Sequence, residues 1–424
     1  MERIRSIALV IAGVCLLSGF VLAEELEPDP EMRDPFWQSP TLTNDWFGFG
    51  QTLRDRGISV NLGFTTVYQQ NVQGGLSTHR RSGRTSGRYD LEVEADLDTL
   101  LGWSGAHVFA LARGGWSEGL DPSSVGSISG VNALAVGDRA IDVWQLYLEQ
   151  SLLEDKLFVR VGKVDLTGGF ACRDCPGSFD GSLFANDEAT QFLNGALVNN
   201  PTIPFPDPGL GVIVHYEPTE SWYISAAAVD AEADVRETGF RTAFHGTDNF
   251  FSMLETGFLP EINSPTGPMQ GAYRVGLWYD PQPKDRFGGG SKRDDIGFYI
   301  SADQMVYKER ADNADTQGLG LFARYGWADS DVNEIRCFWS FGAQYQGLLP
   351  GRDDDVVAFG LAQGRLSPEA GFSASHETSM EMYYQAWITP WLHVAPSVQY
   401  ILNPGGDSSV GDAVVLGFRL GVVF

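Results

Sequence analysis

The last eleven residues constrain the fold of this chain more than any other segment. Large apolar residues occupy every second position from Leu416 to Phe424, and the positions between them carry smaller residues and one charge, Arg419. Side chains of a strand alternate between its two faces, so this segment has one continuous apolar face. An aromatic residue that ends the chain in register with that face resembles the signal read by barrel-assembly machinery. The segment therefore predicts the closing strand of an outer-membrane β-barrel.

The same alternation recurs along the chain and indicates an all-β, transmembrane, antiparallel barrel. It is found over residues 58–65, 91–98, 157–162, 273–279, 296–303, 319–325, 337–346 and 380–388. About fourteen strands can be delimited, and residues 355–375 are too irregular to divide; since single-chain bacterial barrels use even numbers, we predict sixteen strands, with eighteen as the alternative.

The start of the chain indicates export. A basic start and an apolar run over residues 7–22 lead to Ala23, a small residue after which signal peptidase can cut. Asn44 is placed to cap a short helix before the first strand. We therefore predict a signal peptide over 1–23, an N-terminal segment with this helix over 24–57, and the barrel over 58–424.

The balance of charge argues against nucleic acid as a partner. The chain has 55 acidic and 29 basic residues and a net charge of −26, and removing the signal peptide, which carries Glu2, Arg3 and Arg5, makes it −27. A nucleic-acid binder needs basic side chains to displace counterions from phosphates. No later apolar run approaches the roughly 18 residues of a spanning helix. Only a closed barrel satisfies all backbone polar groups in lipid without helices.

The predicted connections alternate in length. Short ones, over residues 102–105, 151–156, 217–220 and 389–391, are expected on the periplasmic side. Long ones, over residues 72–87, 115–139, 167–209, 231–271 and 403–411, are expected on the outer side.

The inward faces of the predicted strands carry charges of both signs. A barrel of this width leaves an aqueous channel. Arginine forks and carboxylates can exchange hydrogen bonds with solute hydroxyls, which favours neutral solutes such as sugars. The alternative is that these charges only hydrate the lumen and pair with one another. We expect the channel wall to include Arg160, Arg274, Arg324, Glu381, Arg419, Glu149, Asp303 and, with an ambiguous parity, Arg113.

The connection over residues 167–209 joins the fifth and sixth strands by our count. This position resembles that of the loop that narrows the lumen of trimeric porins. Its aromatic and acidic side chains could stack on sugar rings and bind hydroxyls, or the segment could be an external loop packed on its own apolar residues. The side chains concerned are Phe170, Phe179, Phe184, Phe192, Phe205, Asp174, Asp180, Asp187 and Glu188.

Two cysteines, Cys172 and Cys175, lie in the same connection. In an oxidising compartment a local disulfide is favoured over a redox pair or half of a zinc site, because no βαβ pattern and no second metal-ligand pair accompanies them. Cys337 has the lipid-facing parity and is expected to be a free thiol. We predict no metal, no cofactor and no enzymatic activity.

Several short motifs follow one another in a specific order along the mature chain. They include Thr43 to Trp46, Leu53 to Gly57, Leu157 to Lys163, Pro350 to Asp355, Glu381 to Tyr384, Thr389 to Leu392 and Asn403 to Gly406. In this order they resemble the carbohydrate-selective porin family, the OprB type. The resemblance implies a sixteen-stranded channel for passive uptake of glucose and similar sugars across the outer membrane.

The sequence leaves competing functions and several partners open. The leading hypothesis is a carbohydrate-selective porin. A general or cation-selective porin is the alternative, and an outer-membrane enzyme or adhesion scaffold is a third. Besides sugars, the expected partners are outer-membrane lipid, the barrel-assembly machinery and lipopolysaccharide, with a homotrimer as a further option. A basic patch in the first long connection, at His79, Arg80, Arg81, Arg84 and Arg88, could meet lipopolysaccharide phosphates or be a solvated loop.

Overall fold

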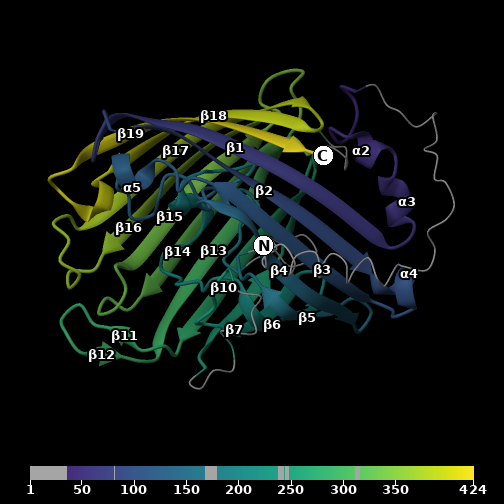
Figure 1. Cartoon of the computed structure of the whole chain (residues 1–424), viewed down its shortest axis with the longest axis horizontal. Helices are drawn as coiled ribbons and strands as arrows, with labels where there is room; N and C mark the ends of the chain where they lie inside the picture. Colours follow the sequence, from purple (N-terminus) through teal and green to yellow (C-terminus); the bar gives the residue numbers. More distant parts are fainter. Residues whose placement is uncertain (1–35, 81, 168–178, 237–242, 244–247, 311–315) are drawn as a thin grey trace.

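Sixteen antiparallel strands close into one barrel in the computed structural model, which describes residues 36–80, 82–167, 179–236, 243, 248–310 and 316–424. Closure occurs at β1, which pairs with β2 on one side and with β19 on the other (Figure 1). The predicted fold and its strand number are therefore confirmed, and the alternative of eighteen is excluded.

The wall consists of long strands joined in sequence order. These are β1 (Ile58–Gly75), β2 (Gly83–Asp96), β3 (Ala106–Trp116), β4 (Arg139–Leu152), β5 (Leu157–Val164), β6 (Gly209–Thr219), β7 (Trp222–Asp230), β8 (Phe250–Phe258), β10 (Gly267–Asp280), β13 (Asp295–Lys308), β14 (Gly318–Ala328), β15 (Ile335–Gln346), β16 (Val356–Leu366), β17 (His376–Thr389), β18 (Leu392–Leu402) and β19 (Gly411–Val423).

Short elements lie in the segments before and between the wall strands. The helices are α2 (Asn44–Phe47), α3 (Gly50–Arg54), α4 (Leu97–Leu101), α5 (Asp121–Ser124), α6 (Gly195–Val198) and the 3-10 turn η2 (Pro404–Gly406). The small strands are β9 (Glu261–Ser264), β11 (Lys284–Asp285) and β12 (Ser291–Lys292). None of the helices in the described ranges has the length and apolarity needed to cross a membrane.

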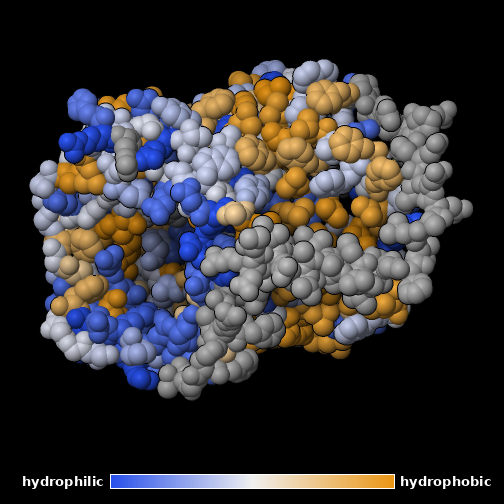
Figure 2. Space-filling view, viewed as in Figure 1, coloured by the Kyte–Doolittle hydropathy of each residue, from blue (hydrophilic) through white to orange (hydrophobic). Residues whose placement is uncertain are grey.

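The strand that ends the chain has the two faces that its sequence predicts. Leu416 and Phe418 of β19 are 48% and 46% exposed on the outer surface, whereas Arg419 is buried on the inner side. On β10 the outward Leu277 is exposed and the inward Arg274 is buried. Figure 2 shows apolar surface over the strands and hydrophilic surface towards the end that carries α5, β11 and β12. Apolar side chains therefore cover the part of the barrel that faces lipid.

The N-terminal segment reaches the seam between β1 and β19. The backbone N–H of Leu42 donates to the carbonyl of Val423 at 2.8 Å. The predicted cap is wrong: the hydroxyl of Thr43, not Asn44, accepts the N–H of Trp46 at 3.1 Å. Asn44 lies inside the turn with a left-handed φ of 50°, so its side chain does not occupy the capping position.

The long connection predicted over residues 231–271 is wrong, because the wall strand β8 crosses the membrane within it. The inward-facing Phe251 and Met253 of β8 are apolar and buried, and they pack in a core cluster with residues of the loop that follows β5. Apolar residues therefore occupy its first inward positions and polar Ser252 and Thr256 its outer face, so the strand lacks the polar-inward alternation by which the other strands were recognised.

Two other boundaries also differ from expectation. The first long connection is shorter than residues 72–87, because β1 continues to Gly75 and β2 begins at Gly83. Polar residues occur on both faces of these strand ends, so the sequence there resembles a loop. Residues 355–375 contain the wall strand β16, whose pattern is interrupted by Gly360 and Gly364.

Two connections enter the barrel and pack on the inside of its wall. One is the β3–β4 loop (residues 117–138), whose Leu120, Val125 and Val131 are buried against β18 and β19. The other is the β5–β6 loop (residues 165–208, described except for 168–178), which packs against β14 to β17. These two loops fill much of the lumen that a sixteen-stranded wall leaves open.

Candidate functional site

The β5–β6 loop narrows the lumen from one side. The ring of Phe192 is fully buried, with its centroid 5.1 Å from that of Tyr383 on β17 and 5.7 Å from that of Phe322 on β14. Phe179 is likewise buried in a core cluster. Of the two hypotheses left open by the sequence, the described residues agree with an inward loop. Phe179 and Phe192 pack on the wall, so neither can stack on a solute.

Two predicted channel-wall carboxylates accept hydrogen bonds from the main chain of this loop. Asp303 on β13 accepts from the N–H of Leu183 at 3.2 Å. Glu381 on β17 accepts from the N–H groups of Leu193 at 3.0 Å and Asn194 at 2.7 Å. Both carboxylates are buried.

Three predicted arginines, on β10, β14 and β19, also contact the loop. Their guanidinium groups are buried, and one of them, Arg274, forms an ion pair with Asp303 at 2.8 Å. Each donates to a loop carbonyl oxygen: Arg274 to Gly181 at 3.0 Å, Arg324 to Leu197 at 3.0 Å and Arg419 to Gln191 at 2.7 Å.

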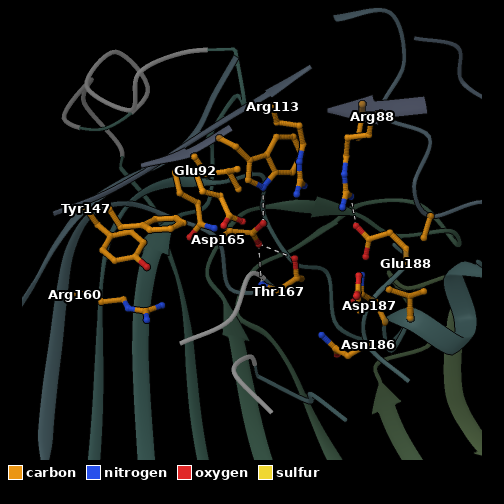
Figure 3. Close-up of a pocket in the computed structure, with 18 residues that line it drawn as sticks. Arg88, Glu92, Arg113, Tyr147, Arg160, Asp165, Thr167, Asn186, Asp187 and Glu188 are labelled. Atoms are coloured by element: carbon orange, nitrogen blue, oxygen red, sulfur yellow. Dashed lines mark hydrogen bonds and ion pairs between the residues drawn. The ribbon is translucent and has the colours of Figure 1, made fainter. Parts of the chain in front are cut away.

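A cavity of about 550 Å³ lies between the β5–β6 loop and the wall formed by β2 to β5 (Figure 3). The predicted Arg113 and Arg160 line it from β3 and β5, and Arg88 lines it from β2. Asp187 and Glu188 line it from the loop. Basic side chains on the wall therefore face acidic side chains on the loop.

Ion pairs order the charged side chains around this cavity. Asp90 accepts from Arg113 Nε at 2.6 Å and pairs with Arg88 Nε at 2.8 Å. Arg88 also forms an ion pair with Glu188, which joins the wall to the loop. The predicted Glu149, on β4, is the carboxylate partner of Arg160.

Aromatic side chains of β4 complete the lining. Trp144 Nε1 donates to Asp165 Oδ2 at 2.6 Å, and the guanidinium of Arg113 lies 4.5 Å from the centre of the Trp144 ring. The guanidinium of Arg160 lies 4.7 Å from the centre of the Tyr147 ring. Such cation–π contacts order the arginines without neutralising them.

Glu188 is a carboxylate of the cavity lining whose pKa is lowered by its neighbours. Burial disfavours its charged form, but the neighbouring charges of Arg88 and Arg113 outweigh burial and lower the pKa of Glu188 below its usual value. Glu188 is therefore ionised at neutral pH, and the cavity keeps charges of both signs.

Comparison with known proteins agrees with this geometry. Residues 80–424 match the family model described as carbohydrate-selective porin, OprB family. The chain belongs to this family.

Individual relatives match over most of their length. Porin B of Pseudomonas aeruginosa is 25% identical over 431 residues, which cover 91% of this chain and 92% of that protein. The putative porin QuiX of Acinetobacter baylyi is 22% identical over 447 residues, covering 96% and 98%. The high-pH structure of Pseudomonas putida OprB has a TM-score of 0.80 at 23% identity, covering 92% of this chain and all of that one. The protein is thus an outer-membrane sugar porin, and its family implies a channel rather than an enzyme.

Two residues at the cavity of this OprB-family porin were missed or misplaced by the sequence reasoning. Arg88 was assigned to a loop patch, whereas it lies on β2 and is 6% exposed. Its parity equals that of Glu92 and Glu94 on the same strand, so extending that alternation backwards would have placed it inside. Trp144 gave no comparable signal, because a tryptophan is equally expected at a lipid interface.

The cysteines of this porin lie away from the cavity or outside the described residues. Cys172 and Cys175 are among the residues that the structure does not describe. Cys337 on β15 is a free thiol, and its Sγ lies 3.5 Å from the hydroxyl of Tyr325. It shares its parity with the exposed Phe341, so it faces outward as predicted.

Proposed function

We propose that glucose-like sugars cross this porin by passive diffusion through the cavity between the β5–β6 loop and the wall of β2 to β5. The observation that carries the proposal is the pairing of opposite charges across a narrow space. Arg88 and Arg113 offer several N–H donors from the wall, and Asp187 and Glu188 offer acceptor oxygens from the loop. A sugar hydroxyl both donates and accepts, so it can replace water at either side.

The charges of the cavity also explain why a neutral solute is favoured. The lining contains three arginines and four carboxylates, so it has almost no net charge to attract one ion strongly. These residues are Arg88, Arg113, Arg160, Glu92, Asp165, Asp187 and Glu188. Ordered polar groups of both signs bind a polyol without holding it tightly, and conduction requires that weak binding.

Planar-bilayer recording tests the proposal. With the purified porin in KCl, we expect glucose to reduce the single-channel current reversibly, and liposomes carrying the porin to swell in glucose faster than protein-free liposomes. Absence of both current block and swelling would contradict the assignment of sugar as the solute.

A cation-selective channel is the second candidate, and one observation favours it. Acidic residues outnumber basic residues by 55 to 29 in the chain, and the cavity lining has one more carboxylate than arginine. Reversal potentials across a KCl gradient separate the two candidates. Strong cation selectivity without glucose block would favour this second function.

A further inference from the structure

Two carboxylates on one face of β17 bind the two inward loops, one loop each. Glu377 accepts from the N–H of Ile128 at 2.9 Å and from the N–H of Ser129 at 3.2 Å in the β3–β4 loop. Four residues further along the strand, Glu381 binds the β5–β6 loop through the amides described above. Residues four apart on a strand share a face, so both side chains project into the lumen.

The two loops are also bonded directly to each other. The N–H of Ala133 donates to the carbonyl of Leu193 at 2.7 Å, and the N–H of Gly195 donates to the carbonyl of Gly130 at 3.0 Å. Leu193 therefore gives its N–H to Glu381 and its carbonyl to the other loop. A shift of either loop would break contacts of both.

Neutral side chains of the wall support the same junction. The carbonyl of Val131 accepts from Gln69 of β1 at 2.7 Å and from Gln399 of β18 at 2.8 Å. Both donors are buried. This part of the β3–β4 loop is thus fixed from β1, β17 and β18 at once.

Most of these wall contacts are made to main-chain atoms of the two loops. Buried charge-assisted hydrogen bonds are stronger than neutral ones, and removing the acceptor leaves buried N–H groups unpaired. The path of the loop backbone therefore depends on the wall carboxylates. The side chains that the loop presents to the cavity, Asp187 and Glu188, are not needed for these bonds.

We propose that Glu377 and Glu381 are positioning residues that hold the two inward loops as one unit, and that this unit sets the width of the conducting cavity. The proposal rests on the proposed function only in taking this cavity as the solute path. It assigns these two carboxylates to pore geometry rather than to contact with the sugar.

Single-channel recording of E377A, E381A and the double variant tests the proposal, with barrels first verified as folded by heat-modifiable electrophoresis. Each alanine variant is expected to raise the ionic conductance and its fluctuations, and the double variant to exceed the larger single effect only slightly, because the loops are bonded together. The variant E381Q, which keeps an acceptor oxygen, should lie between E381A and the wild type. The control is E94A, which removes an inward carboxylate of β2 whose ion pair is with His107, and it should match the wild type.

Two results would overturn the proposal. Unchanged conductance in folded E377A and E381A would show that these carboxylates do not position the loops, and fully additive effects would show that the loops move independently. Hydrogen–deuterium exchange of E381Q gives a second test that needs no alanine variant. Faster exchange in residues 127–133 as well as 193–195 supports one unit, and faster exchange in 193–195 alone contradicts it.

The conductance readout separates this proposal from the choice of solute. If glucose does not block the wild-type channel while E381A still raises ionic conductance, the sugar assignment fails and the positioning role stands. If glucose blocks the wild type and both alanine variants conduct and block as the wild type does, the positioning role fails and the sugar assignment stands.

Discussion

Trp144 on β4 and Asp165 at the start of the β5–β6 loop are joined by a hydrogen bond of 2.6 Å between Nε1 and Oδ2. This bond ties the loop to β4, whereas Glu381 and Arg419 bind it from β17 and β19. Trp144 also forms an apolar part of the cavity lining and orders Arg113 by a cation–π contact. Trp144 thus holds the start of the loop, orients Arg113 and forms part of the surface that a solute contacts.

Replacing this indole should weaken sugar binding. For W144A we expect the half-blocking glucose concentration to rise about fivefold, a loss on the order of 1 kcal/mol, because the solute loses apolar contact and Arg113 loses its stacking partner. The measurement is glucose titration of single-channel current. The control W327A removes a tryptophan that is 38% exposed on the outer face of β14. An equal effect of both variants would contradict a specific role for Trp144.

Removing one wall arginine should make the channel more cation-selective. In R160Q the carboxylate of Glu149 loses its partner, and the cavity gains one unit of net negative charge. We expect the reversal potential across a tenfold KCl gradient to shift towards the potassium potential. R54Q is the matched control, because Arg54 pairs with Asp45 in the N-terminal segment rather than in the cavity. An unchanged reversal potential in R160Q would place the ion path elsewhere.

The faces of the outer wall could be predicted from the sequence because lipid imposes one rule on every strand. Outward residues such as Leu277 and Phe418 must be apolar, and alternation then identifies the inward set. The rule failed at β8, where the inward Phe251 and Met253 are apolar because they are buried under an inward loop. The alternation rule did not assign Arg113 to one face. The inward neighbours of Arg113 on β3, Phe109 and Leu111, are apolar, and β3 pairs irregularly with β4.

The contacts of the inward charges could not be predicted in the same way. Parity placed Arg274, Arg324 and Glu381 inside, and the structure divides the predicted set into residues that bind loop main chain and residues that line the cavity. That division depends on where the β5–β6 loop runs, which is decided by contacts between segments far apart in sequence. A main-chain partner leaves no trace in the pattern of side chains, so these contacts could not be predicted from it.

Asp180 should make loop packing depend on pH. Burial, followed by the charge of Glu255 against the opposing effect of Arg324, raises the pKa of Asp180 to about 7. A raised carboxyl pKa stabilises the fold at pH values below the ordinary pKa of about 4, and this contribution is lost as the pH rises towards 7. In D180N the group cannot ionise. At pH 8 we therefore expect the free energy of unfolding of D180N, measured with urea, to exceed that of the wild type by about 2–4 kcal/mol.

The pH profile checks this account of Asp180. D180N and the wild type should unfold at similar urea concentrations at pH 4 and diverge between pH 4 and 7. The control D354N alters an exposed carboxylate in the β15–β16 turn and should follow the wild type throughout. A D180N variant that is less stable than the wild type at pH 8 would show that the ionised carboxylate contributes a favourable contact.

Phe192 should be required for the loop to stay packed on the wall. Its buried ring fills the space between Tyr383 and Phe322, and deleting a buried phenylalanine side chain costs about 3–5 kcal/mol. We therefore expect F192A to unfold at lower urea concentration and to conduct with larger fluctuations. The comparison is F418A, which faces lipid and leaves no cavity because lipid fills the space, so its cost should be smaller. A stable F192A with quiet conductance would contradict the packing described for this loop.

The central claim is that a neutral sugar passes through the cavity that Arg88, Arg113 and Arg160 of the wall line together with Asp187 and Glu188 of the loop. Liposome swelling by the wild-type porin in isosmotic glucose, compared with a sugar acid of similar size, tests it most directly. We predict fast swelling in glucose, slower swelling in the sugar acid, and a loss of this discrimination when Asp187 and Glu188 are both replaced by their amides. Equal rates for both solutes in the wild type, or no swelling in glucose, would contradict it.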